Sequence, residues 1–317
     1  MRNFLIIPIL FIFLVSCSNS EDFDIPKISK LEKLEEHSNQ FIKGIYSYDN
    51  GIHVAIGFGI ANSIMVEGEG GNIIIDTTDD VSQAKEVLSE FQKINQNPIK
   101  AIIYTHNHGD HVFGASEFYN AQEEKPLVIA HSTTAEKVEK ILGIINPIIT
   151  LRSGKMFGTN LDDNELINVG LGPYLSAGRS SPGYIAPTLT FEKELKLEIA
   201  GHKVELYHAP GETDDQLFVW FPELSALMPG DNFYTTFPNL YTIRGTSHRD
   251  VIGWVNSIDK MRSLDPQYLF PSHTMPVEGE EISNALIIYR DGMQYVHDQT
   301  VRLMNKGLTP DEIVEEL

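Results

Sequence analysis

The sequence predicts an α/β fold in which a β-rich half leads into a β-α half, and this order occurs twice. Three short apolar runs at residues 53–57, 63–66 and 72–76 alternate with glycine-rich turns, which is typical of a hairpin-rich sheet. After residue 80 the apolar spacing becomes that of an amphipathic helix, and a second series of short strands begins near residue 195. The 317 residues, 42% of them hydrophobic, are enough to bury one large core.

The chain is strongly acidic. Its 24 Lys and Arg residues against 44 Asp and Glu residues give a formal net charge of −20, and the acidic residues are scattered along the chain. A surface of this sign repels phosphate backbones, so we expect no nucleic-acid partner.

Residues 1–17 have the organisation of an export signal. A positive charge at Arg2 precedes an apolar stretch over residues 4–15, which is too short to span a bilayer. The stretch ends in Leu-Val-Ser-Cys, which resembles the cleavage box of bacterial lipoproteins and implies that Cys17 becomes a lipidated N-terminus. Acyl chains would hold the protein on a membrane of the bacterial cell envelope, at its periplasmic or extracellular face. The alternative is a buried anchor helix with an incidental cysteine.

Cys17 is the single cysteine, which leaves the folded domain without a disulfide and restricts any metal site to His, Asp and Glu ligands. Residues 18–40 are polar and acidic, and we interpret them as a tether that contains a short helix. The folded domain is predicted to begin near Phe41.

A helix and a buried strand precede the candidate functional site in the first half of the chain. Asp79 or Asp80 is placed to cap a helix that runs to about Ile94. Residues 100–104 form a continuous apolar run typical of a buried strand. Functional residues commonly follow the ends of such strands, so we expect a site directly after residue 104.

The rest of the chain divides into an irregular stretch and a second half. A strand at residues 126–130 and a helix at 133–142 come before a Gly-, Pro- and Ser-rich insertion over 143–190, which either shapes a pocket or forms a solvated surface loop. The elements predicted after it are strands at 195–199, 203–208, 217–221, 226–228 and 268–270, a helix at 250–264, and a helical pattern from about residue 280.

Four potential metal ligands fall within six residues in the segment His106-x-His108-x-Asp110-His111. Gly109 permits the tight backbone that turns them inward. Imidazole and carboxylate ligands suit Zn²⁺, and the four groups are too many and too close for one ion, so two metals are implied. The alternative is a surface cluster that arose by chance.

This loop after a buried strand resembles that of the metallo-β-lactamase superfamily, which implies a four-layer αββα sandwich. The family's later ligands can be sought at later strand ends. His-Ala-Pro-Gly-Glu places Glu212 where that family usually has histidine, and the bridging carboxylate and last histidine are matched by Asp231 and His273. The resemblance therefore assigns His106, His108 and Glu212 to one zinc and Asp110, His111 and His273 to the other, with Asp231 between. His131 and His208 occupy no expected ligand position and are expected to be structural or to support the ligands, as are His37, His53, His202 and His297.

A dinuclear zinc centre implies hydrolysis by a metal-bound hydroxide, with Asp110 and Asp231 as catalytic ligands. Three carboxylates and a hydroxide balance the charge of two Zn²⁺ ions, so an anionic substrate needs its own cationic anchor. Arg244 offers a planar fork of donors for a sulfate or similar oxyanion. The alternative is that Arg244 pairs with a surface carboxylate.

The segment from Asn239 to Gly245, Asn-Leu-Tyr-Thr-Ile-Arg-Gly, resembles the sulfate-recognition segment of zinc-dependent alkyl sulfatases, a group that also has Glu at the histidine position. The resemblance implies that Asn239 and Arg244 contact the sulfate of an alkyl ester. The bridging residue differs, because that group tends to use Glu where this chain has Asp231. Tyr174 and Tyr184 are the candidates for the group's substrate-contacting tyrosine.

The domain organisation follows from these segments. Residues 41–278 are expected to form the catalytic domain, and residues 279–317 resemble the start of the helical dimerisation domain of alkyl sulfatases, which leaves a homodimer open. Two other functions remain possible alternatives: another hydrolase of the same fold, acting on a lactone, β-lactam, phosphodiester or thioester, and a metal-binding or scaffold protein without activity.

Overall fold

The first of two sheets is built from the N-terminal half of the chain. The computed structural model describes residues 30–162, 165–175 and 182–317. The seven strands lie in sequence order, with antiparallel pairing as far as β4 and parallel pairing from β4 to β7. They are β1 (Gly44–Ser47), β2 (Ile52–Ile56), β3 (Ser63–Gly68), β4 (Gly71–Ile75), β5 (Ile99–Ile103), β6 (Leu127–His131) and β7 (Leu189–Phe191).

The second sheet is built from the C-terminal half. Its six strands lie in the order β13-β12-β11-β10-β9-β8, and all neighbours are antiparallel except β11 and β12. They are β8 (Glu194–Ile199), β9 (His202–His208), β10 (Leu217–Phe221), β11 (Ala226–Met228), β12 (Tyr268–Leu269) and β13 (Val277–Glu278).

The two sheets pack face to face. Alternate residues of the central strands point between them, and the shared core joins Ile73 and Ile75 of β4 to Leu217, Val219 and Phe221 of β10. The other set of alternating residues points outward under helices. This explains why β10 is apolar throughout and why β4 and β5 each contain one polar residue, Asn72 or Lys100, because both faces of these strands are largely buried.

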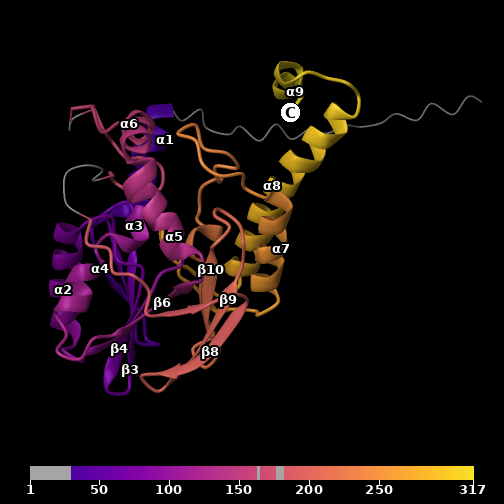
Figure 1. Cartoon of the computed structure of the whole chain (residues 1–317). Helices are drawn as coiled ribbons and strands as arrows, with labels where there is room; N and C mark the ends of the chain where they lie inside the picture. The colour runs from indigo at the N-terminus through magenta and orange to yellow at the C-terminus, as the bar shows by residue number, and fades with distance from the viewer. Residues whose placement is uncertain (1–29, 163–164, 176–181) are drawn as a thin grey trace, which may run out of the picture.

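Helices cover the outer face of each sheet (Figure 1). On the first sheet they are α2 (Val81–Ile94), α3 (Gly109–Val112), α4 (Ala115–Asn120) and α5 (Thr134–Glu139). On the second they are α7 (Val251–Arg262) and α8 (Glu281–Met304), which contribute Trp254, Ile258, Leu286 and Met293 to one buried cluster. The predicted four-layer αββα sandwich is confirmed, and Asp80 caps α2 by accepting from the backbone N–H groups of Ser82 and Gln83.

The structure refines several predicted boundaries. The irregular stretch after residue 143 contains the end of η2 (Lys140–Ile144) and a full helix, α6 (Asn146–Met156). In the segment interpreted as a tether, α1 (Lys30–His37) and η1 (Ser38–Phe41) are fastened to the domain, because Asn168 Nδ2 donates to the Leu34 carbonyl and Gln40 Oε1 accepts from the Met275 N–H.

The C-terminal helices continue the fold beyond residue 278. The N-terminal half of α8 shares the buried cluster of α7, whereas α9 (Pro310–Glu316) follows at the far end of α8, away from the two sheets (Figure 1). A short turn, η3 (Gly230–Asn232), lies between β11 and α7. Among residues 30–162, 165–175 and 182–317, no helix is long and apolar enough to cross a membrane. The predicted signal peptide and Cys17 lie outside the described residues.

Candidate metal centre

The seven predicted ligands come together at the edge where the two sheets meet. His106 and His108 follow β5, Asp110 and His111 lie in α3, Glu212 lies between β9 and β10, Asp231 lies in η3 and His273 follows β12. The Leu217 N–H donates to the Thr105 carbonyl at 2.9 Å, which joins β10 of one sheet to the end of β5 in the other. The loops after these strands therefore converge although they are far apart in the sequence.

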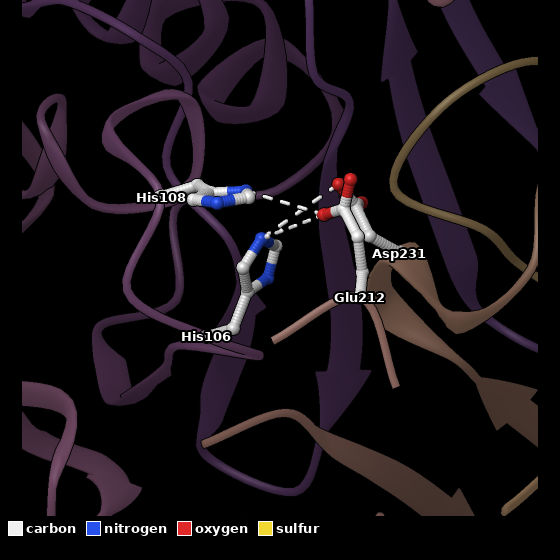
Figure 2. A group of neighbouring side chains, drawn as sticks. All are labelled: His106, His108, Glu212 and Asp231. Atoms are coloured by element: carbon white, nitrogen blue, oxygen red, sulfur yellow. Dashed lines mark ion pairs between the residues drawn. The ribbon is translucent and has the colours of Figure 1, made fainter. Parts of the chain in front are cut away.

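The first group of potential ligands contains His106, His108, Glu212 and Asp231. Glu212 Oε2 lies 3.5 Å from His106 Nε2 and 3.2 Å from His108 Nδ1, and Asp231 Oδ2 lies 3.7 Å from His106 Nε2. Figure 2 shows the two imidazole rings from the first half of the chain facing the two carboxylates from the second half.

The second group contains Asp110, His111 and His273. Asp110 Oδ2 lies 3.3 Å from His111 Nε2 and 3.4 Å from His273 Nε2. Asp231 Oδ2 is also close to this group, at 3.4 Å from His111 Nε2 and 3.2 Å from His273 Nε2. One oxygen of Asp231 therefore faces both groups, in the position that the sequence analysis gave to a bridging carboxylate.

These residues fit metal ions, because the potential ligand atoms of each group lie within 4.8 Å of one another and several of them are buried without a partner. His106 Nε2, His111 Nε2, Glu212 Oε2 and Asp231 Oδ1 are buried and have no hydrogen-bond partner among the described residues. Buried polar atoms without partners are costly unless a ligand satisfies them. The donor set of imidazoles and carboxylates matches borderline divalent cations.

Hydrogen bonds behind the histidines direct the free nitrogens toward the centre. His111 Nδ1 lies 2.7 Å from Asp76 Oδ2, and His273 Nδ1 lies 2.8 Å from the Ile60 carbonyl oxygen. Both partners are acceptors, so each Nδ1 must donate, and Nε2 is the nitrogen of each ring that a metal would bind in place of a proton.

Asp76 was missed by the sequence analysis. It is fully buried at the end of β4, and its carboxylate also accepts from the Thr105 N–H, the Thr105 hydroxyl and the Ser272 hydroxyl. A carboxylate directly after the apolar run of β4, at the same sheet edge as the ligands, was the signal that could have identified it. Asp76 thus fixes the loop before His106, the loop before His273 and the ring of His111.

Charge pairing shifts the pKa values of the clustered groups. Burial alone would lower the pKa of His273, but Asp231 and then Asp110 favour its charged form and raise the pKa to about 9. Burial would likewise lower the pKa of His111, and Asp231, Asp110 and Asp76 raise it well above its usual value. Burial would raise the pKa of Asp110, yet His111 holds it below its usual range. In the metal-free protein, protons therefore occupy this second group.

Arg249 is a second residue that the sequence analysis missed. Its side chain is buried, Nη2 lies 3.0 Å from Glu212 Oε1, and Nη1 donates to the Asn239 carbonyl. Burial would raise the pKa of Glu212, but Arg249 and His108 lower it well below its usual value. One guanidinium therefore joins a candidate metal ligand to the predicted sulfate segment.

A cavity of about 860 Å³ opens over the metal groups. His108, Asp110, Glu212, Asp231 and His273 line it, together with Asn239, Arg244 and the apolar Ile148, Ile149, Phe157 and Leu171. The stretch after residue 143 therefore shapes the pocket, which was one of the two alternatives for it.

Arg244 stands in the wall of this cavity. Its guanidinium lies over the Phe157 ring at 5.9 Å, and Nη1 lies 3.8 Å from Met156 Sδ. It forms no ion pair with a carboxylate within the described parts of the chain. Burial lowers the pKa of Arg244, while Glu212 and Asp110 favour its charged form. The alternative of a surface ion pair is therefore not what the structure shows.

The two tyrosine candidates and the histidines His131 and His208 lie outside the cavity, whereas His248 lines it. Tyr174 donates to the Phe58 carbonyl and Tyr184 packs against Tyr104, and neither lines the cavity, whereas the exposed Tyr241 does. His131 and His208 stack on each other with ring centroids 4.1 Å apart, outside both metal groups.

The chain is similar in sequence to two proteins named as alkylsulfatases. A linear primary-alkylsulfatase from a Pseudomonas species is 42% identical over 260 residues, which cover 80% of this chain and 49% of that protein. The alkyl/aryl-sulfatase BDS1 of Saccharomyces cerevisiae is 28% identical over 291 residues, covering 87% of this chain and 44% of that protein. The chain thus spans about half the length of the curated relatives it matches.

Solved structures and a family model agree with these relatives. The stereoselective inverting sec-alkylsulfatase Pisa1 from a Pseudomonas species superimposes with a TM-score of 0.83 at 25% identity, covering 90% of this chain and 47% of that chain. The family model described as Metallo-beta-lactamase superfamily matches residues 56–273, from β2 to the last candidate ligand. With this match over most of its length, the chain belongs to the metallo-beta-lactamase superfamily.

Proposed function

We propose that this protein is a dinuclear zinc hydrolase that cleaves sulfate esters of alkyl alcohols. The observation that carries the proposal is the position of Arg244, a cation without a carboxylate partner among the described residues, in the wall of the cavity above the candidate metal centre. The names of the relatives, alkylsulfatases in each case cited above, support the same substrate class.

Two zinc ions are the cofactors in this proposal. His106, His108 and Glu212 would hold one ion, Asp110, His111 and His273 the other, and Asp231 would bridge them, which is consistent with the two groups of donor atoms. When bound, such ions supply Lewis acidity and activate water as a nucleophile near neutral pH. Asp110 and Asp231 line the cavity, so the ions that they would hold would supply this chemistry at its wall.

Arg249 changes the electrostatic balance expected from the ligands. The sequence suggested a centre in which three carboxylates weaken the attraction for anions. In the structure the outer oxygen of Glu212 is engaged by a buried guanidinium, so one of the three negative charges is offset locally. The centre can therefore attract a sulfate ester more strongly than its ligand set alone indicates.

The chain's own residues would orient the substrate. The Arg244 guanidinium presents paired N–H donors to sulfate oxygens, and Asn239 lines the same wall. The alkyl group would lie along Ile148, Ile149 and Phe157, because these apolar side chains line the cavity. This arrangement holds the sulfur over the metal centre and the hydrocarbon away from it.

The remaining sequence predictions extend the proposal. Lipidation at Cys17 would place the enzyme on the bacterial cell envelope, and helices after residue 278 would take part in a homodimer.

The test is hydrolysis of medium-chain alkyl sulfates by the zinc-loaded protein, measured as sulfate release together with bound zinc. We expect about two zinc ions per chain, from the two ligand groups. Arg244→Ala should lower kcat/KM by roughly 100-fold or more, because a preorganised charged donor is lost, without lowering the zinc content. The control is Arg302→Ala, which removes an exposed arginine of α8. Opening of a lactone or β-lactam with no release of sulfate would contradict the proposal.

A further inference from the structure

Two segments, residues 140–161 and 233–249, form the rim of the cavity. The first contains η2 and α6, and the second is the loop that leads from η3 toward α7. Both contribute lining residues, among them Ile148 and Tyr241, and Arg152 Nη1 donates to the Arg244 carbonyl at 3.4 Å, which joins the two segments. Figure 1 shows α6 and this orange loop at the same end of the molecule.

The rim exposes large apolar side chains to solvent. Ile144 is 81% exposed and Ile243 is 86% exposed, and neither lines the cavity. Leu151, Phe237 and Tyr241 are also more than half exposed, at 55%, 58% and 63%. Exposed apolar side chains gathered around one opening mark an interaction surface, whereas isolated ones are ordinary.

The rim is also cationic on an otherwise acidic protein. Residues 140–161 and 233–249 contain no Asp or Glu, although the chain has 44 acidic residues against 24 Lys and Arg. Their cations are Lys140, Arg152, Lys155, Arg244 and Arg249. Arg249 is buried against Glu212, while Lys140, Arg152 and Lys155 are exposed. An anionic surface would thus be attracted here and repelled by most of the remaining surface.

We propose that this rim docks on the surface of an aggregate of anionic alkyl amphiphiles, such as a micelle or bilayer that contains alkyl sulfates. The inference rests on the proposed function, because it concerns how such a substrate reaches the cavity. Ile144 and Ile243 would enter the boundary between head groups and hydrocarbon, as the apolar face of an interfacial helix does, and the exposed cations would contact sulfate groups. A substrate molecule could then pass into the cavity without first becoming a free monomer in water.

The experiment compares two matched variants in a full chain that carries Cys17→Ser, so that no acyl anchor contributes. The rim variant is Ile144→Ser with Leu151→Ser, which leaves the segment from Asn239 to Gly245 unchanged. The control variant is Ile288→Ser with Val314→Ser, which alters exposed apolar residues of α8 and α9, at 63% and 78% exposure. Binding is measured by sedimentation with phosphatidylcholine vesicles, with and without a long-chain alkyl sulfonate, which has the charge of the substrate and no ester to cleave.

We expect the parent and the control variant to bind the sulfonate-containing vesicles, with an affinity that falls at high salt. The rim variant should bind these vesicles with an affinity at least about tenfold lower. All three should hydrolyse a short, monomeric alkyl sulfate at the same rate, which tests the proposed function separately. Equal vesicle binding by the rim and control variants would overturn the docking proposal, as would binding that is independent of the sulfonate. A dimer that dissociates only in the rim variant, with vesicle binding unchanged, would assign the rim to a second copy of the chain and also overturn it.

Discussion

Arg249 Nη2 and Glu212 Oε1 form a buried ion pair at 3.0 Å, and the same guanidinium donates through Nη1 to the Asn239 carbonyl. The pair joins the loop between β9 and β10 to the loop before α7. The negative charge of a metal-binding carboxylate repels an anionic substrate unless a nearby cation offsets it. Arg249 supplies that compensation from the side opposite to the histidines.

The first prediction concerns Arg249→Met. Removing one partner of a buried pair leaves the other charge uncompensated, so the metal-free protein should lose about 3–5 kcal/mol of unfolding free energy. The zinc-loaded protein should lose less, because the ion stabilises the same carboxylate. Chemical denaturation with and without zinc measures both values.

Two comparisons make this prediction specific. Arg249→Lys keeps the charge and should recover part of the loss, although it cannot reproduce the planar fork. Arg262→Met breaks the partly exposed pair with Asp259 and should cost only about 0–1 kcal/mol. A loss for Arg249→Met that is equal with and without zinc would point to packing alone.

Asp76 is the subject of the second prediction. Asp76→Asn preserves the size of the side chain but places an amide where His111 Nδ1, Thr105 and Ser272 need a carboxylate acceptor. Loss of such support behind a ligand lowers metal affinity by roughly 10–100-fold, so competition with a zinc chelator should show a loss of that size.

The matched control for Asp76→Asn is Asp265→Asn. Both residues have a positive φ, 56° for Asp76 and 52° for Asp265, which Asn tolerates as well as Asp. Asp265 lies outside the metal cavity. If both variants bind zinc as tightly as the parent, Asp76 does not position the site.

The third prediction is a pH dependence of the metal-free protein. The pKa of His273 is raised from its ordinary 6.5 to about 9, so its charged form stabilises the fold. That stability is fully present below pH 6.5 and is lost as the pH rises through about 9. Without metal, the parent should therefore lose stability over this window relative to His273→Gln.

Zinc binding should release the proton that His273 carries in the metal-free protein. Zinc must displace the proton on His273, so apparent affinity should rise with pH up to about 9, and binding at neutral pH should release protons. Calorimetry in buffers of different ionisation enthalpy counts the released protons. Binding that releases none at neutral pH would contradict the assignment of a proton to this group.

The sequence was sufficient for the features that are local. Apolar runs and turn residues predicted most strands of both sheets, although not β1, β7 and β13. The dense loop at His106 to His111 predicted the centre because four of its ligands lie on one short segment. The order of Glu212, Asp231 and His273 completed it through a family resemblance. The structure brings all seven side chains together at one edge.

Features that depend on tertiary contacts could not be predicted from the sequence. Nothing local distinguishes Arg249 from the neighbouring Arg244, because its role depends on burial against a loop formed by a distant segment. The helix α6 was not predicted because Gly, Pro and Ser suggested a loop. Pro147 is compatible with the helix because it lies in the first turn, where the missing N–H has no partner within the helix. Edge strand β1 is short and only half buried, so its pattern is weak.

The last prediction concerns the glycine before Asp231. Gly230 has a φ of 59°, and a Cβ there would lie 2.1 Å from Gln216 Nε2 and 2.7 Å from Thr105 Cβ. Gly279 has a φ of 62° but nothing within 4 Å of such a Cβ. Gly279→Ala should thus show the backbone strain alone, about 1–2 kcal/mol.

Gly230→Ala should cost about 1–3 kcal/mol more than Gly279→Ala, because the methyl group also displaces packed neighbours. One of these neighbours is Thr105, which holds the loop before His106, and the strained residue itself precedes the bridging candidate Asp231. The bound zinc should therefore fall in Gly230→Ala and stay unchanged in Gly279→Ala, as measured on folded protein after dialysis. Equal stability and equal zinc in the two variants would mean that the close approach at Gly230 does not position Asp231.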